Sequence, residues 1–178
     1  MKNLILVVIG CAFLWACSQP KPEPEAAPVE TKPQPLEVGD SRYIDIAKQG
    51  LQNLREGNID GFTSSLADNA KFDWNYLDSL VGKQAISEYW KDRRTRVIDT
   101  LITTNEVWIT LKANDPPAPG LPTGTYVFAW YKATAKYNAT GKSMTQWIHQ
   151  INHFDANDKI DYISQFLDRV PIQQATKK

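Results

Sequence analysis

The sequence predicts an α+β domain built on one curved antiparallel sheet. Just after residue 40, apolar residues recur every three to four positions, which is the spacing of amphipathic helices. From Val97 onward, four long stretches rich in Val, Ile, Thr and aromatic residues are separated by turn signals. Helices followed by a run of strands, without an internal repeat, indicate α+β organisation rather than alternating α/β.

Three helices are expected in the first half of the domain. The first runs from about 42 to 56, where Ser41 can cap its start and Gly57 its end. A shorter one follows, with apolar positions at Ile59, Phe62 and Leu66. The third is expected within 81–96, and its apolar side carries Ile86, Tyr89 and Trp90.

One strand is expected between the second and third helices, and four more after them. In "KFDWNYL" (71–77), every second residue is aromatic, so Phe72, Trp74 and Tyr76 are predicted to face the interior. The later strands are expected at 97–113, 123–138, 142–155 and 159–170. A long Pro-rich loop at 114–124 joins the first two of these four, and such loops often cover a pocket or contact a partner.

The first residues form a targeting segment. Lys2 is followed by an apolar run from Leu4 to Leu14, which is too short to span a bilayer. The sequence Leu-Trp-Ala-Cys at 14–17 resembles a bacterial lipobox, which implies a signal peptide at 1–16 and acylation of Cys17. We therefore expect a lipid-anchored protein of the cell envelope, with the outer membrane favoured and the domain periplasmic or surface-exposed. The alternative is an uncleaved apolar leader with an incidental cysteine.

Residues 17–40 are predicted to be the lipidated cysteine and a disordered Pro/Glu-rich stalk, since six prolines and four glutamates leave little to bury. The domain is expected at 41–172, followed by a flexible tail at 173–178. Residues 41–178 hold 17 basic and 15 acidic side chains, so no electrostatic signature of nucleic-acid binding is present. The run Arg93–Arg96 suits a helix end, and an anion site there is the less favoured interpretation.

His149 and His153 are four residues apart, a spacing at which two helical imidazoles can bind one zinc ion. This segment is predicted to be a strand, on which the two side chains lie roughly 13 Å apart. One zinc ion cannot bind both at that distance, and no cysteine of the domain can join them. We expect no metal and no cofactor.

The order of these segments resembles the NTF2-like superfamily, in its SnoaL-like and ketosteroid-isomerase-like branches. The resemblance rests on "GNIDGFTSSLADNAKFDW", "VGKQAISEYW" and "HFDANDKIDYISQFLD", and covers nearly all of 41–170. It implies a cone of three N-terminal helices packed against a strongly curved antiparallel sheet, with a pocket at the open end. Relatives with this fold include enzymes, carriers and structural modules.

The resemblance also locates the positions that carry ketosteroid-isomerase chemistry. The catalytic aspartate corresponds to Trp74 and the acid that donates to the oxyanion to Gln150, so this chemistry is not expected. Asp73 and His149 each precede the matching position by one residue, and a proton-transfer enzyme of isomerase or dehydratase type using both is the alternative. The alternation of 71–76 favours an outward Asp73.

A non-catalytic small-molecule-binding or assembly module is the leading expectation. The predicted pocket is apolar with a few amides, as small-molecule sites usually are. Its expected residues are Phe72, Trp74, Tyr76, Tyr89, Gln150, Asn152, Ile163, Gln165 and Leu167. The other interpretation of these rings is simple core. The expected partners are the membrane, through Cys17, a small apolar ligand, and a second copy through the sheet face. A structural subunit of an envelope complex is a further alternative.

Overall fold

A computed structural model describes residues 33–178. The expected signal peptide, Cys17 and most of the stalk lie outside the described residues. The helices are α1 (Arg42–Glu56), α2 (Ile59–Ser64), α3 (Lys83–Asp92) and α4 (Arg169–Thr176), and a π-helical turn η1 (Arg93–Val97) continues α3. Within this part of the chain no helix is long and apolar enough to cross a bilayer.

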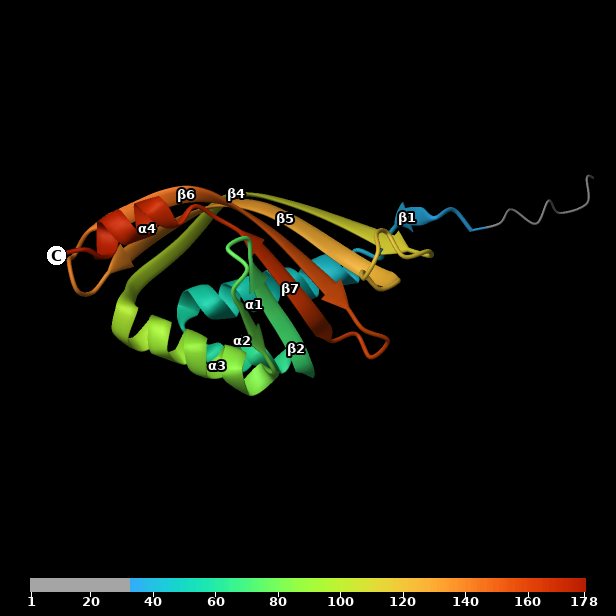
Figure 1. Ribbon diagram of the computed structural model, residues 1–178, viewed down its shortest axis with the longest axis horizontal. Helices are drawn as coiled ribbons and strands as arrows, with labels where there is room; N and C mark the ends of the chain where they lie inside the picture. The colour runs from blue at the N-terminus through green and yellow to red at the C-terminus, as the bar shows by residue number, and fades with distance from the viewer. Residues whose placement is uncertain (1–32) are drawn as a thin grey trace, which may run out of the picture. The chain divides into compact units, whose positions relative to one another are not determined.

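The strands form one seven-stranded sheet in the order β1-β4-β5-β6-β7-β2-β3. They are β1 (Leu36–Val38), β2 (Leu66–Trp74), β3 (Ser79–Val81), β4 (Ile98–Ala113), β5 (Gly124–Tyr137), β6 (Ser143–Phe154) and β7 (Ile160–Phe166). Figure 1 shows the sheet arching over α1, α2 and α3, with α4 near the hairpin that joins β5 and β6. The predicted α+β class, with helices against a strongly curved sheet, is confirmed.

The structure adds β3, an unexpected strand that pairs with β2 and includes Val81 of the expected third helix, and it differs from the expected sheet in two further respects. The sheet is mixed, because β2 pairs with β7 in parallel, with Phe72 beside Ile163 and Trp74 beside Gln165. β2 also begins at Leu66, which was expected to lie in the second helix. Leu66 is 1% exposed and pairs with Ile160, so tertiary pairing overrides the local helical spacing.

The boundaries at both ends of the domain also differ from the prediction. Residues 36–38, expected in the stalk, form β1 and pair with β4. The last strand ends at Phe166 rather than near 170, and α4 extends through residues 173–176 of the expected flexible tail. The Asp168 side chain caps α4 by accepting from the backbone N–H of Val170. Ala175 of this helix is buried in a cluster with Ile98 and Tyr137.

The hydrophobic core lies between the helices and the inner face of the sheet. Its most deeply buried members include Ile86 of α3, Val127 of β5 and Ile163 of β7, each at most 1% exposed. Burying one such side chain contributes about 1.5–3 kcal/mol relative to leaving it in water. Because this core is complete within residues 33–178, which form one compact unit, we treat this segment as able to fold on its own.

A bulge bends β4 and links it to α1. Pairing with β5 shifts register between Thr104 and Val107, and Asn105 there has a positive φ of 55°. The Glu106 carboxylate accepts from Arg55 of α1 at 3.2 Å, and it also accepts from the Thr103 hydroxyl and the Trp108 indole N–H. These contacts hold the bend of the strand against the last turn of α1.

Arg94 of η1 fixes the other end of β4 to the same helix. Its guanidinium donates to the carbonyls of Leu54 and Arg55 at 3.1 and 2.9 Å, and to that of Ile98 at 2.8 Å. The two α1 carbonyls belong to its C-terminal turn, where helical partners are missing. Partial burial lowers the pKa of Arg94, because burial disfavours its charged form.

We expect Arg94→Ala to lower the free energy of unfolding by about 2–3 kcal/mol, because three carbonyls lose charge-assisted hydrogen bonds. Urea unfolding of residues 33–178 measures this as a lower midpoint. Arg96→Ala is the control, since the Arg96 side chain is 78% exposed and pairs only with Asp92. Equal destabilisation by both variants would contradict a specific role for Arg94.

Candidate ligand-binding site

A cavity of about 300 Å³ lies between the inner face of the sheet and the helices. Leu51 and Leu54 of α1 form one wall. Small side chains of β5, Ala133 and Ala135, form the opposite wall and leave room in front of the sheet. Ile172 lines the cavity from α4. The volume is at the lower end of the range for small-molecule pockets, so a compact ligand fits.

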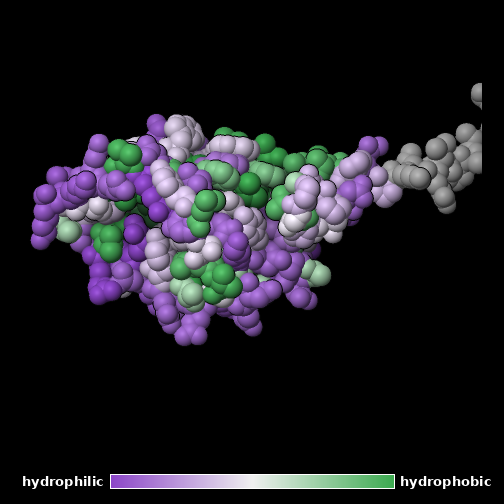
Figure 2. Space-filling model, in the orientation of Figure 1, coloured by the Kyte–Doolittle hydropathy of each residue, from purple (hydrophilic) through white to green (hydrophobic). Residues whose placement is uncertain are grey.

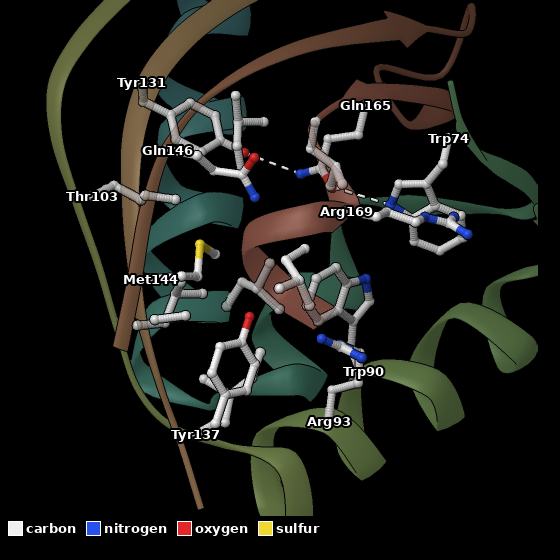
Figure 3. Close-up of a pocket in the computed structure, with 18 of the residues that line it drawn as sticks. Trp74, Trp90, Arg93, Thr103, Tyr131, Tyr137, Met144, Gln146, Gln165 and Arg169 are labelled. Carbon is white, nitrogen blue, oxygen red and sulfur yellow. Dashed lines mark hydrogen bonds between the residues drawn. The ribbon is translucent and has the colours of Figure 1, made fainter. Parts of the chain in front are cut away.

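The deep wall carries a hydrogen-bond network, of which Figure 3 shows the part formed by Trp74, Gln165 and Tyr131. The Trp74 indole N–H donates to the Gln165 amide oxygen at 3.2 Å, and the Gln165 amide nitrogen donates to the Tyr131 hydroxyl at 3.1 Å. Gln150 accepts from both Gln165 and Tyr131, at 3.0 and 2.9 Å, and itself donates to Asn152 at 2.9 Å. The amides of Gln150 and Gln165 and the Tyr131 phenol therefore satisfy one another, while the amide nitrogen of Asn152 at the end of the chain is buried without a partner.

Tyr131 is the titratable member of this network. Burial raises the pKa of its hydroxyl far above the usual value of 10.0, and the hydrogen bond from Gln165 offsets only part of the shift. The hydroxyl consequently stays protonated at physiological pH. It serves as a donor to Gln150 rather than as a base.

The mouth of the cavity contains the charged groups. Asp78 accepts hydrogen bonds from the Arg169 guanidinium through both carboxylate oxygens, and this pairing lowers the pKa of Asp78. Arg169 also lies over the Tyr76 ring, at 4.5 Å from its centroid. These contacts join the turn after β2 to the start of α4. Asp78 is the only carboxylate among the residues that line the cavity, and it is already paired.

Arg93 lies on the α3 side of the cavity with two tyrosines near it. Figure 3 shows the Tyr137 hydroxyl pointing into the cavity, and the Arg93 guanidinium lies over the Tyr89 ring. Burial raises the pKa of Tyr89 and of Tyr137, and the positive charge of Arg93 opposes both shifts. The cavity therefore has an apolar middle, a self-satisfied deep wall and a cationic edge.

The predicted pocket residues divide between two cavities. Trp74, Tyr89, Gln165 and Leu167 line the main cavity. Phe72, Gln150, Asn152 and Ile163 line a separate space of about 10 Å³ between α1, α2 and the sheet, to which Gln165 also contributes. Phe72, Asn152 and Ile163 are at most 2% exposed, so they are core residues behind the cavity rather than contacts for a ligand.

Tyr76 does not line the main cavity. β2 ends at Trp74, and a turn follows in which Leu77 has a positive φ of 66° and donates its backbone N–H to Trp74. The alternation of the strand therefore stops before Tyr76. Its ring is 47% exposed, and its hydroxyl accepts from the backbone N–H of Arg169 at 3.4 Å.

Asp73 and His149 both lie on the outer face of the sheet. The Asp73 carboxylate accepts from Lys71 at 2.8 Å, and the His149 ring stacks on Trp130 with centroids 4.6 Å apart. Neither residue lines the cavity. His153 is also on this face, but it is buried at 3% exposure between Asp161 and the Thr123 carbonyl.

The outer face is notably apolar. Phe128, Trp130, His149 and Phe166 form a continuous stack across three strands. In Figure 2, hydrophobic side chains gather along the top of the molecule, where the sheet lies in Figure 1. The exposed apolar residues of this face include Val107, Ile109, Trp130, Trp147 and Phe166. Association of two copies through this face stays a prediction.

Within residues 33–178, no cluster of three or more His, Cys, Asp or Glu side chains is arranged to hold a metal ion.

Several cavity residues were not predicted from the sequence. The alternation of β5 could have indicated Tyr131, Ala133, Ala135 and Tyr137, because they share the face opposite Tyr126, Phe128 and Trp130. Met144 and Gln146 follow in the same way from the alternation of β6. Arg169 could not be found in this way, since α4 was not expected.

The family model described as "SnoaL-like domain" matches residues 47–163. The chain belongs to the SnoaL-like family. No curated protein sequence is significantly similar to it. The matched residues span α1 to β7, and therefore include both sides of the cavity.

Solved structures of SnoaL-like and related folds resemble this one at low sequence identity. A candidate polyketide cyclase from Xanthomonas campestris pv. campestris has a TM-score of 0.61 at 14% identity, covering 77% of this chain and 98% of that one. An epoxide hydrolase of the LEH-like type from M. tuberculosis has a TM-score of 0.55 at 12% identity, with 76% and 90% covered. An NTF2-like protein from Burkholderia xenovorans has a TM-score of 0.55 at 13% identity, with 79% and 100% covered. At these identities the likeness shows the NTF2-like fold alone.

The buried phenol of the deep wall leads to a prediction on alkaline stability. The folded chain holds the Tyr131 proton more tightly than the unfolded chain does. The stability that the neutral phenol adds is therefore complete well below pH 10 and is lost as the pH rises through and above that value. Tyr131→Phe loses about 1–3 kcal/mol at pH 8 by leaving the network incomplete. We expect the difference from the wild type to narrow between pH 9 and 11.

Urea unfolding of residues 33–178 across this pH range measures the effect. Tyr76→Phe, at an exposed ring, is the control and is expected to follow the wild-type profile. Parallel profiles for Tyr131→Phe and the wild type would show that the buried phenol does not contribute to alkaline stability.

Proposed function

We propose that this SnoaL-like protein is a membrane-anchored binding module for a compact, largely apolar small molecule, and that it does not catalyse proton transfer of the ketosteroid-isomerase type. One observation carries this proposal. The cavity is open to a ligand, yet its polar lining contains no histidine, and its one carboxylate, Asp78, is held by Arg169. A base that accepts a proton near neutral pH is what such catalysis needs.

The geometry gives little support to the proton-transfer alternative. Asp73 and His149 are separated from the cavity by the sheet itself, and the Asp73 carboxylate is engaged by Lys71. Bringing Asp73 inward would turn Phe72 and Trp74 to the outer face, and both rings are buried at 2% and 8% exposure. The cost of exposing two aromatic rings disfavours that register.

The cavity also argues against a purely structural subunit. A module that only supports an assembly gains stability from filling its interior, because a void forfeits packing contacts. Here Ala133 and Ala135 stand where larger side chains would close the space. This choice of small residues supports a binding role.

Anchoring is proposed from the sequence alone. The apolar leader ends in a lipobox-like segment, and acylation of Cys17 would hold the domain at a bacterial membrane, with the outer membrane favoured. The Pro/Glu-rich segment that follows would act as a spacer between the membrane and β1.

Filling the cavity is expected to abolish ligand binding. A ligand present at 100 times its Kd stabilises the folded state by about 2.7 kcal/mol. For a domain of residues 33–178, this raises the melting temperature by roughly 5–10 °C. We expect such a rise for at least one class among steroids, fatty acids and fused-ring aromatics. Ala133→Leu places a branched side chain in the cavity and removes the rise, as thermal-shift titration measures.

Ala133→Ser is the matched control, because it changes the same residue and leaves the space open. A rise that survives in Ala133→Leu would place the ligand elsewhere. If no class raises the melting temperature of the wild type, the binding proposal is wrong.

Lipidation predicts that attachment to the membrane depends on one residue. In a bacterial host supplied with labelled palmitate, the full chain should incorporate label and partition into the detergent phase of a Triton X-114 extraction. Cys17→Ser should lose the label, whereas Cys11→Ser, inside the leader, should keep it. A wild type that takes up no label but still partitions into the detergent phase would leave the uncleaved leader as the better account of this segment, and label in Cys17→Ser equal to the wild type would place acylation elsewhere.

A further inference from the structure

The edge of the cavity carries a positive charge that no acidic side chain of the described domain neutralises. Arg93 is half-buried and lines the cavity from the first residue of η1. Its guanidinium carbon lies 5.5 Å from the centroid of the Tyr89 ring. Among residues 33–178, the arginines that form salt bridges are Arg42, Arg55, Arg96 and Arg169. The charge of Arg93 is therefore available to a ligand.

The polar groups that lack partners around this cavity are hydrogen-bond donors. The amide nitrogen of Gln146 is buried without a partner in the described structure, while its amide oxygen accepts from the backbone N–H of Asp168 at 2.9 Å. The indole N–H of Trp90 is likewise buried without a partner. Both residues line the same cavity as Arg93. Unpaired buried donors favour a ligand that brings acceptor oxygens.

The remaining lining orients such a ligand. At the deep wall, the Gln165 amide and the Tyr131 hydroxyl are already bonded to each other and to their neighbours. The space between the deep wall and Arg93 is lined by apolar groups, including Leu54, Ala133 and Met144. An apolar body therefore belongs in the middle of the cavity, with its acceptor group at Arg93.

A carboxylate is the acceptor group that fits this edge best. A guanidinium presents a planar pair of N–H donors, which matches the two oxygens of a carboxylate. A dianionic group such as a phosphate would need more positive charge, and the second arginine at the cavity, Arg169, is balanced by Asp78. The charge of Arg93 is thus suited to a single negative charge.

We propose that the cavity binds a compact monocarboxylate with an apolar body, and that Arg93 pairs with the carboxylate. This inference rests on the proposed binding function and specifies its ligand class. The carboxylate lies toward η1, and the apolar body lies between α1 and the alanines of β5. The surroundings of Tyr89 and Tyr137 are consistent with this placement, because the charge of Arg93 acts on both hydroxyls.

Matched acids and amides test the proposal, since each pair differs in charge but hardly in shape. The probes are octanoate and octanamide, 3-phenylpropanoate and 3-phenylpropanamide, and 2-naphthoate and 2-naphthamide. Calorimetric titration of residues 33–178, with quenching of tryptophan fluorescence from Trp74 and Trp90 as a second readout, gives the affinities. For at least one pair, we expect the acid to bind about tenfold or more tightly than its amide, as for a hydrogen bond to a charged group.

Arg93→Gln should remove the preference for the acid while leaving binding of the amide within about twofold. Arg93→Lys keeps the charge without the planar donor pair and should retain part of the preference. Arg96→Gln, three residues along and exposed, should bind as the wild type does. Melting curves establish that each variant is folded before titration.

The outcomes separate this inference from the function on which it rests. Amides that bind as well as acids, or an acid preference that survives in Arg93→Gln, would overturn the carboxylate assignment and leave the apolar binding site intact. Absence of binding by both members of every pair would overturn the assignment, and absence of a thermal shift across the broader panel would overturn the proposed function as well.

Discussion

The curvature of the sheet is the constraint on which the cavity depends. β4 bends at the bulge around Asn105, and Glu106 holds the bend against Arg55 of α1. The paired strand β5 follows this bend and presents Ala133 and Ala135 to the interior. A curved sheet draws away from the helices beneath it, and small side chains leave that space unfilled. Bulge and alanines act together, because long side chains at the same positions would fill the space with core.

The two ends of the cavity use polar groups in opposite ways. At the deep wall, Trp74, Gln165 and Tyr131 form a network whose donors and acceptors are bonded to one another. Such a network rigidifies the wall and offers a ligand little beyond its surface. Elsewhere in the lining, the amide nitrogen of Gln146 and the indole N–H of Trp90 are buried without a partner among the described residues, and Arg93 forms no salt bridge there. The two ends of the cavity therefore differ in the polar groups that they leave without partners.

The sequence predicted the fold well because the fold depends on periodicity. Alternation in β2 correctly placed Phe72 and Trp74 inside, and the helical spacing of α1 matched its bounds. The candidate site was predicted less well, for three physical reasons. Tyr76 was misplaced because the turn with Leu77 ends the alternation, which local propensity did not reveal. Arg169 was missed because α4 is stabilised by tertiary packing of Ala175. The cavity itself arises from a bend, and a bulge at Asn105 has no strong sequence signal.

η1 shows how two adjacent arginines acquire separate tasks. Arg94 turns toward α1, and its donors are used by the carbonyls of Leu54, Arg55 and Ile98. Arg93 lines the cavity, and its charge is not used by any salt bridge within the described residues. A π-helical turn is a common local feature of functional sites, because its wider turn changes the direction of the side chains that follow. Arg94 is held in place by the three carbonyls that accept its hydrogen bonds. Under the proposed binding mode, Arg93 selects the ligand while its neighbour Arg94 holds η1 against α1.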